Sequence, residues 1–423
     1  MIPKLLLAFN STARAITIIG YVNAPRHDLS KMPDRRSLIL DGRTWAEVSL
    51  TALGENFHVV QKHVGAGVTI CAIVKADGYG HGAVECALAL QSEGAKWLGV
   101  TDAAEGLALR DAGVTARILL MTGIWKGEEN GIVAQNLTPT IWEPWHIETL
   151  ERAARQRNIN LPVHLKLDTG MNRLGASPEK LPRLCEMLTA CKYLRLEGVS
   201  THFASAEVLD DENTVRQMKC FEEGLAVFRS YGLQPQLIHM GNSAAMSARP
   251  ETWKTMVRPG IALYGYSLAF TRGGQPAAVD PLPLRPVLSW KTRVLTVKDV
   301  AAGQAVGYMG TFVTQTRSRI AVLPVGYADG YPRLLSNRAR VIVRGEYAPV
   351  VGRVSMDLTI VDVSHIREVA VGDEVILIGR SRGKGSGSDE DKSVDAVELA
   401  RLCESVPYEI LCGLSQRVPR VYS

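Results

Sequence analysis

The sequence lacks any apolar run close to the roughly 18 residues of a membrane-spanning helix, so we expect no membrane span. Its 7 cysteines are an odd number, and no two of them have the CxxC spacing. This pattern argues against a disulfide framework and against a zinc site, and it favours a reducing compartment. We therefore expect a cytoplasmic protein without a metal centre.

An excess of charge of one sign is also missing. The chain has 48 Lys and Arg against 43 Asp and Glu, a net charge of +5, with the two signs mixed along its length. Without a basic stripe, nucleic acid is not an expected partner. A small anionic ligand fits this balance better.

Two segments have too little apolar character to pack. Residues 1–38 hold two short apolar runs and then a polar stretch. We expect either a disordered extension or an over-long start, with the protein itself beginning near Met32. A secretory signal that ends near Ala24 is the alternative, and it would mean export. The run Ser381–Lys392 alternates Gly, Ser, Lys and acids, which predicts a mobile surface loop.

The rest of the chain is long enough for two cores, with 423 residues of which 46% are hydrophobic. Over residues 39–281, apolar segments that end in small or polar residues alternate with helix-period stretches such as Ala83–Gln91 and Asn213–Tyr231. The predicted strands are Thr69–Ala76, Trp97–Thr101, Ile118–Thr122, Thr138–Trp142, Val163–Asp168, Leu196–Phe203, Leu237–Met240 and Val257–Tyr264. Eight alternations predict a closed (β/α)8 TIM barrel rather than an open sheet.

From residue 282 to 423, β-branched runs separated by glycine turns replace the helical pattern and predict a second, mostly-β domain. The predicted strands are Val287–Val297, Ala305–Thr311, Arg319–Val325, Ala339–Val343, Pro349–Val351, Leu358–Val363 and Glu374–Ile378. One short helix, Val394–Ser405, is expected to close this domain.

One lysine stands out in the segment AIVKADGYGHG, where Lys75 follows an apolar run and precedes a glycine-rich turn. A parallel strand delivers a side chain into an active site at this place. Low-dielectric surroundings penalise the ammonium, so the pKa of Lys75 should fall and leave a nucleophilic amine suited to a Schiff base. On this segment alone, a lysine that pairs with Asp77 is the alternative.

The other predicted strand ends carry further polar residues that ordinary cores would not collect there. They are Lys166, Asp168, Arg173, His202, His239, Asn242, Ser243 and Arg258. Because the carboxyl ends of barrel strands meet on one face, we expect these side chains to surround one site.

Nine segments then occur in one order: VKADGYGHG, HLKLDTGMNRLG, THFA, GNSAA, RPGIALYG, VGYMGTF, PVGYADGYPR, GRVSMD and PYEIL. Together they resemble the alanine racemase family over about residues 40–423. The resemblance implies a pyridoxal 5'-phosphate (PLP) enzyme that interconverts L-alanine and D-alanine and so supplies D-alanine for peptidoglycan. It also implies a head-to-tail homodimer with shared active sites, and a strand at Thr44–Val48 that joins the β domain.

By this resemblance, Lys75 and Tyr308 are the two acid–base groups. Lys75 holds the cofactor, and Tyr308 reaches in from the other subunit on the opposite face of the substrate. Racemisation needs two faces, because the proton removed on one side must be replaced from the other. A chain from Tyr308 through His202 to Arg258 supplies cationic neighbours. Without the resemblance, Tyr308 would be an interfacial aromatic in a turn.

Arg258 decides between PLP chemistries. A guanidinium that faces the pyridine nitrogen keeps this nitrogen unprotonated, which makes the ring a weaker electron sink than a carboxylate partner would and discourages transamination. An arginine before a Pro-Gly turn more commonly pairs with a surface acid. The resemblance assigns the remaining cofactor contacts to Tyr79, Arg173, Asn242, Ser243, Gly260, Ile261 and Tyr408, with most of these forming a phosphate cradle.

The substrate contacts also follow from the resemblance. Arg173 would hold the substrate carboxylate, beside Lys166, a position where the family often has a carbamylated lysine. The remaining substrate residues would be Tyr327, Arg353, Met356 and Asp357. A narrow entrance favours a side chain as small as a methyl group.

Three other functions stay open at this point. A non-catalytic PLP carrier would be a single barrel, which would leave the residues after Pro281 without a purpose. A broad-specificity amino acid racemase would agree with an exported chain, because relatives of that kind are typically exported. A PLP-dependent amino acid decarboxylase would share the two domains, but it needs a carboxylate at the pyridine nitrogen, and Arg258 and Tyr308 argue against it. Asn172, where the family often has glycine, departs from the pattern without touching the proposed chemistry.

Overall fold

The structure, a computed structural model, describes residues 42–381 and 391–423. The extension predicted over residues 1–38 lies outside the described residues, as does nearly all of the loop predicted between Ser381 and Lys392. The two ends of that loop are strand residues, because Ser381 and Lys392 are antiparallel partners. None of the described helices is long and apolar enough to cross a membrane.

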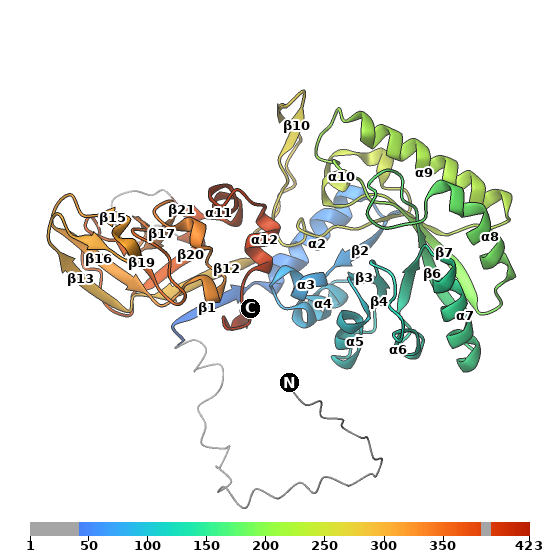
Figure 1. The fold of residues 1–423 in the computed structure, drawn as a ribbon, viewed down its shortest axis with the longest axis horizontal. Coiled ribbons are helices and arrows are strands. Elements are labelled where there is room, and N and C mark those ends of the chain that lie inside the picture. Colours follow the sequence, from blue (N-terminus) through green and yellow to red (C-terminus); the bar gives the residue numbers. More distant parts are fainter. Residues whose placement is uncertain (1–41, 382–390) are drawn as a thin grey trace, which may run out of the picture.

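Eight parallel strands form a barrel, in the order β8-β7-β6-β5-β4-β3-β2-β9 (Figure 1). They are β2 (Thr69–Ile73), β3 (Trp97–Val100), β4 (Arg117–Leu120), β5 (Thr138–Ile141), β6 (Leu161–Lys166), β7 (Leu194–Ser200), β8 (Leu237–His239) and β9 (Met256–Val257). Backbone hydrogen bonds from Thr255 N to Ile238 O (3.1 Å) and from Arg258 N to Gly241 O (2.8 Å) join the last two strands. The predicted (β/α)8 barrel is therefore confirmed.

Helices surround the barrel strands and bury their apolar faces against them (Figure 1). They are α2 (Leu50–Val64), α3 (Lys75–Tyr79), α4 (Ala83–Ser92), α5 (Ala103–Asp111), α6 (Glu129–Ala134), α7 (Pro144–Arg157), α8 (Leu181–Ala190), α9 (Glu212–Ser230) and α10 (Ser243–Ala248). The sequence starts them with ordinary caps: Asp102 accepts from Glu105 N, and Asp211 accepts from Asn213 N and Thr214 N. The strands are buried on both faces, as parallel sheets usually are.

The C-terminal part is built from mainly antiparallel sheets, in which β1 and β22 are a parallel pair. One sheet has the order β18-β17-β20-β12-β1-β22 with β21 beside β20, and another has the order β13-β16-β19. The strands are β1 (Thr44–Val48), β12 (Leu288–Arg293), β13 (Thr296–Val300), β14 (Ala305–Val306), β15 (Phe312–Val313), β16 (Ser318–Leu323), β17 (Arg340–Val343), β18 (Glu346–Pro349), β19 (Thr359–Asp362), β20 (Glu374–Ser381), β21 (Lys392–Val394) and β22 (Arg420–Tyr422). The N-terminal strand β1 pairs with β12 over five residues, so the chain enters the barrel from the C-terminal sheet.

Several predicted strands are wrong in extent. The predicted strand Pro349–Val351 shares only Pro349 with β18, because Val350 makes just an isolated bridge with Val361. The predicted strand Val287–Val297 is two strands, β12 and β13, which belong to different sheets. The predicted strand Ala305–Thr311 ends at Val306, because Gly307 and Met309 take φ of +72° and +61° and bend the chain into a short 3-10 helix. The last barrel strand is only β9, since Pro259 has no amide to continue the ladder.

Some elements of the structure have no counterpart among the predicted ones. The hairpin of β10 (Phe270–Arg272) and β11 (Gln275–Ala277) projects from the body of the molecule (Figure 1). The helices α11 (Ala396–Leu402) and α12 (Pro407–Cys412) follow β21, although only one helix was predicted there. Figure 1 shows α12 beside the barrel, next to α3.

Candidate active site

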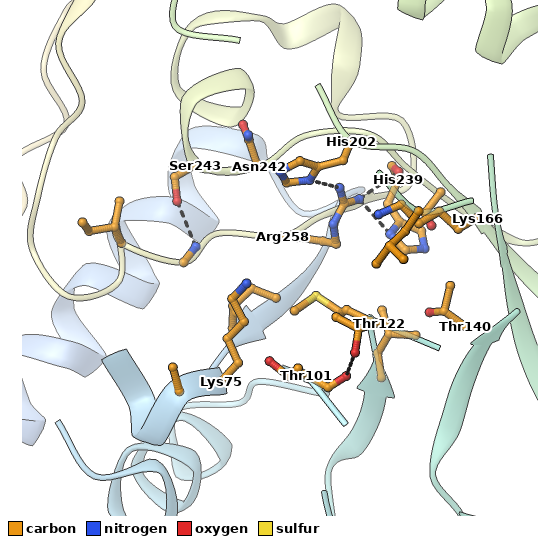
Figure 2. Close-up of a pocket in the computed structure, with 18 of the residues that line it drawn as sticks. Lys75, Thr101, Thr122, Thr140, Lys166, His202, His239, Asn242, Ser243 and Arg258 are labelled. Atoms are coloured by element: carbon orange, nitrogen blue, oxygen red, sulfur yellow. Dashed lines mark hydrogen bonds between the residues drawn. The ribbon is translucent and has the colours of Figure 1, made fainter. Parts of the chain in front are cut away.

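A cavity of about 650 Å³ opens at the carboxyl ends of the barrel strands (Figure 2). It is lined by these predicted residues from the barrel and from α12: Lys75, Tyr79, Lys166, Arg173, His202, His239, Asn242, Ser243, Arg258, Gly260, Ile261 and Tyr408. Asp168 was also expected there but does not line the cavity, because its Oδ1 accepts from Gly170 N and Asn172 N, each at 3.0 Å. The lining residues come from distant parts of the sequence, so the fold is what places them around one space.

The lining of this cavity is cationic. Lys75, Lys166, Arg173 and Arg258 contribute side chains, and no Asp or Glu among the described residues lines it. Buried cations in a lining without acidic residues favour ligands that carry negative charge. The cavity therefore suits a ligand with phosphate or carboxylate groups.

Lys75 is the first residue of α3, directly after β2 and Val74. Burial is the main cause that lowers the pKa of its amine, and the charge of Arg173 lowers it further. In Figure 2, Lys75 points toward the centre of the cavity. An amine of lowered pKa in this place is better suited to act as a nucleophile or as a base than an ordinary lysine.

Lys166, at the end of β6, is a second lysine of the cavity whose pKa is lowered. Burial, followed by the charges of Arg258 and Arg173, lowers the pKa of its amine from 10.5 to about 8. A substantial part of this amine is therefore neutral near pH 8.

Arg258 is buried and makes several hydrogen bonds in the cavity wall. Its Nη1 donates to the Nδ1 and the carbonyl of His239, at 2.9 and 2.8 Å, and its Nη2 donates to Thr201 O at 2.7 Å. Within the described part of the chain, its acceptors are carbonyls and imidazoles rather than carboxylates. Burial lowers the pKa of Arg258 to about 10, so it remains a cation at neutral pH.

The hydrogen bonds of Arg258 continue through the barrel core. His239 Nδ1 accepts from Arg258, so His239 carries its proton on Nε2, which lies 2.9 Å from His164 Nδ1. The proton of His164 is then on Nε2, which makes no hydrogen bond within the described part of the chain and lies 3.8 Å from Glu197 Oε2. Arg117 binds both oxygens of Glu197 at 2.6 and 2.5 Å. One polar chain therefore links the cavity to the far end of the barrel.

His202 lies on the other side of Arg258, with 3.4 Å between His202 Nδ1 and Arg258 Nη2 (Figure 2). Burial, followed by the charge of Arg258, lowers the pKa of His202 to about 2. The imidazole is therefore neutral and accepts a hydrogen bond from Arg258 on Nδ1, so its own proton is on Nε2.

The residues predicted as a phosphate cradle pack closely. Ser243 Oγ accepts from Gly260 N at 2.9 Å, so this amide is already bound to a side chain. A Cβ on Gly260 would lie 2.2 Å from the hydroxyl of Tyr79, which explains the glycine. The rings of Tyr79 and Tyr408 are 6.0 Å apart. Asn242 caps α10 through its side-chain oxygen, which accepts from Ala245 N at 3.0 Å.

Apart from Tyr408 of α12, the predicted residues of the C-terminal part do not line the cavity. The exposed fractions of Tyr308, Tyr327 and Met356 are 69%, 45% and 53%. Two hydrogen bonds join their loops, from Tyr327 N to Ser355 O and from Ala328 N to Met356 O, both at 3.0 Å. Asp357 pairs with Arg417 at 2.9 Å. Arg353 belongs to the same group of loops, because a Cβ on Gly307 would lie 3.5 Å from its amide.

Sequence reasoning missed part of the cavity wall. The missed residues are Ile73, Ala76, Thr101, Leu119, Met121, Thr122, Thr140, Leu174, Ser200, Thr201 and Cys412. Most of them stand at or just after the end of a barrel strand, and this position is the signal that could have found them. His164 and Glu197 were missed because buried polar residues inside strands resemble core positions.

Comparisons with known proteins give one consistent family. Residues 48–268 match the model of the alanine racemase N-terminal domain, and residues 287–422 match that of the alanine racemase C-terminal domain. The chain is 42% identical over 385 residues to alanine racemase from Symbiobacterium thermophilum, covering 90% of this chain and 98% of that protein. It is 39% identical over 387 residues to alanine racemase from Geobacter sulfurreducens, with the same coverage.

Solved structures agree with the sequence matches. Alanine racemase from Streptomyces coelicolor superimposes with a TM-score of 0.83 and 33% identity, covering 92% of this chain and 99% of that one. Alanine racemase from Bartonella henselae, with covalently bound pyridoxal phosphate, superimposes with a TM-score of 0.78 and 29% identity over 90% of this chain and 100% of that one.

Proposed function

This chain belongs to the alanine racemase family and is an isomerase that interconverts L-alanine and D-alanine, and from this premise we propose a two-base mechanism in which Lys75 and the partner subunit's Tyr308 act on opposite faces of the substrate. The observation that carries the proposal is the cavity itself. Among the described residues, the cavity is lined by a lysine of lowered pKa and by several cations, but Tyr308 is not one of its lining residues. The second base would therefore come from another copy of the chain.

The residues present fit pyridoxal phosphate, the cofactor that this family uses. The cationic, acid-free lining suits its phosphate, and the close packing of Tyr79 over Gly260 beside Ser243 leaves polar groups at one end of the cavity. Lys75 would hold the aldehyde carbon, and Arg258 would face the ring nitrogen. When bound, the cofactor withdraws electrons from the substrate and makes its α-hydrogen acidic.

The chain's own residues would then move the proton. The amine of Lys75, whose pKa burial lowers, takes the α-proton on its face of the substrate or returns one there. Arg173 holds the substrate carboxylate as a fixed cation. Because Arg258 stays protonated, it does not donate a full proton to the ring nitrogen, and this limits side reactions such as transamination.

A homodimer would complete the site. The loops that carry Tyr308 and Met356 expose large apolar side chains, including Met309 at 82% exposed, and such groups usually mark a protein interface. A head-to-tail pair would place these loops, with Tyr327, Arg353 and Asp357, over the partner's cavity. There they would form a narrow entrance that admits the methyl group of alanine and restricts larger amino acids.

Two further parts of the proposal concern charge and cellular role. Lys166 would carry a carbamate, because its amine is partly neutral and its neighbours are cations that an anion would relieve. The D-alanine produced would supply peptidoglycan synthesis.

The experiment follows the α-hydrogen directly. The purified protein is incubated with pyridoxal phosphate and L-alanine in heavy water, and both deuterium at the α-carbon and D-alanine are measured. The proposal predicts D-alanine that carries deuterium. Deuterated L-alanine without inversion would show that only one base works and would contradict the role of Tyr308. Repeating the assay with larger amino acids tests the entrance.

A further inference from the structure

The turn that carries Lys75 has an unusual backbone. Ala76, Asp77, Gly78 and Tyr79 take φ of +53°, +53°, +60° and +55°, so α3 is one turn of left-handed helix. Only glycine adopts this conformation without a steric cost, and three of the four residues have a Cβ. Such a turn persists only where its surroundings over-determine it.

Glu105, in the first turn of α5, contacts the residue directly after Lys75. Its Oε1 accepts from Ala76 N at 2.8 Å, and its Oε2 accepts from Thr101 N at 2.7 Å. The carboxylate therefore joins the loop after β2 to the loop after β3. The Ala76 amide belongs to the first left-handed residue, directly after the lysine.

Other contacts hold the far end of the turn. Asp77 Oδ1 accepts from Ala83 N at 2.9 Å. Arg420 donates to Gly80 O from both Nε and Nη2, each at 3.0 Å. These contacts restrain the exit of the turn, so Glu105 is the side chain that restrains its entry at Lys75.

The charge of Glu105 also acts on Lys75. The titratable groups that shift the pKa of Lys75 are Arg173 and Arg258, which lower it, and Glu105 and Cys412, which raise it. Burial raises the pKa of the Cys412 thiol, so this group is neutral. Glu105 is therefore the carboxylate among these groups that opposes the surrounding cations.

We propose that Glu105 is a positioning residue for Lys75, which holds the left-handed turn through the Ala76 amide and supplies the negative charge that keeps the lysine nitrogen able to bind a proton. This inference rests on the proposed role of Lys75. Glu105 does not itself line the cavity, but it holds the backbone amides of the lining residues Ala76 and Thr101, so it acts on Lys75 through the backbone and through its charge.

The test uses the holoenzyme and the variants Glu105→Gln and Glu105→Asp. The glutamine keeps the size but loses the charge and one acceptor, and the aspartate keeps the charge but is one methylene shorter. The matched control is Glu128→Gln, because Glu128 likewise accepts a loop amide, that of Trp125 at 2.7 Å, after the next strand. Two quantities are measured: kcat in each direction, and the pH midpoint of the absorption band that reports protonation of the lysine nitrogen holding the cofactor.

We expect Glu105→Gln to lower kcat by about 10-fold, the loss of one charge-assisted hydrogen bond, and to move the midpoint to lower pH. The Glu105→Asp variant should keep the midpoint near that of the unsubstituted protein while kcat still falls. An unchanged midpoint and kcat in Glu105→Gln, with the same values in Glu128→Gln, would overturn the inference.

A second substitution keeps the test decisive if Glu105→Gln folds poorly. The Ala76→Gly change removes the steric cost of the left-handed residue, so it should recover part of the kcat lost in Glu105→Gln but none of the midpoint shift. Additive effects of the two substitutions would contradict the positioning role. Borohydride reduction of the unsubstituted holoenzyme, followed by peptide mass spectrometry, separates the two proposals. Cofactor found on another lysine would overturn the role of Lys75 and not that of Glu105 in holding the turn.

Discussion

The lowered pKa of Lys166 makes carbon dioxide a component that the enzyme should need. A carbamate forms only from a neutral amine, and burial with the charges of Arg258 and Arg173 lowers the pKa of this amine from 10.5 to about 8. At pH 8, about half of such an amine is neutral, against well under 1% for an ordinary lysine. Lys166 should therefore carry a carbamate when few other lysines do. Removing bicarbonate and carbon dioxide should release this carbamate.

The loss of the carbamate has a calculable consequence for the site. With a free amine, the protonated fraction of Lys166 repels Arg173, whereas a carbamate attracts and orients it. If the carbamate contributes one charge-assisted hydrogen bond of about 1.5–3 kcal/mol, kcat/KM should fall by about 10- to 100-fold on its removal.

Carbon-13 magnetic resonance measures the carbamate directly. Protein equilibrated with labelled bicarbonate should give one carbamate resonance that is missing in Lys166→Arg and present in Lys192→Arg, a change at an exposed lysine. Occupancy should rise from pH 7 to pH 9, because the neutral amine is gained as pH passes about 8. Full activity in thoroughly degassed buffer, or the same resonance in Lys166→Arg, would refute the reasoning.

Three further predictions follow from the site. Tyr308→Phe should reduce racemisation by about 100-fold or more while cofactor affinity stays the same, and equal turnover to the unsubstituted enzyme in both directions would remove Tyr308 as a base. Glu197→Gln should destabilise the barrel by about 2–4 kcal/mol at pH 7. Although burial raises the pKa of Glu197, His164 and Arg117 outweigh it and hold this pKa below its ordinary value, so the stabilisation is present above the unfolded carboxyl pKa and is lost as pH falls through the folded one. The difference in urea unfolding between the variant and the unsubstituted protein should therefore shrink in acid. His239→Leu removes an acceptor of Arg258 and should lower kcat by about 10-fold, with KM unchanged; a change in KM alone would contradict it.

The barrel could be predicted because its signal repeats. Each strand is short and buried on both faces, and a helix follows it. The spacing of the apolar residues therefore switches between a strand pattern and a helix pattern along the chain. Boundaries failed where backbone geometry overrides propensity. Gly307 and Met309 turn a β-branched run into a bend, and the chain between β12 and β13 changes sheets without a strong turn signal.

The site was predictable to the extent that motifs mark strand ends. Lys75 and Arg258 stand near glycines and prolines that predict a turn. The sequence does not show, however, that α3 is left-handed. Glu197 and His164 could not be found, because a buried polar residue in a strand acquires its meaning only from a partner on another strand. Their contacts with Arg117 and His239 exist only in the folded barrel.

The most direct test of the shared, two-base site is complementation between two inactive variants. Lys75→Ala and Tyr308→Phe are purified separately, mixed, dissociated and reassembled, and racemisation is measured. If each site uses Lys75 from one subunit and Tyr308 from the other, half of the sites in mixed dimers are intact, and activity should return to about a quarter of that of the unsubstituted enzyme. Reassembled mixed dimers that remain as inactive as the separate variants would contradict a site built from two subunits.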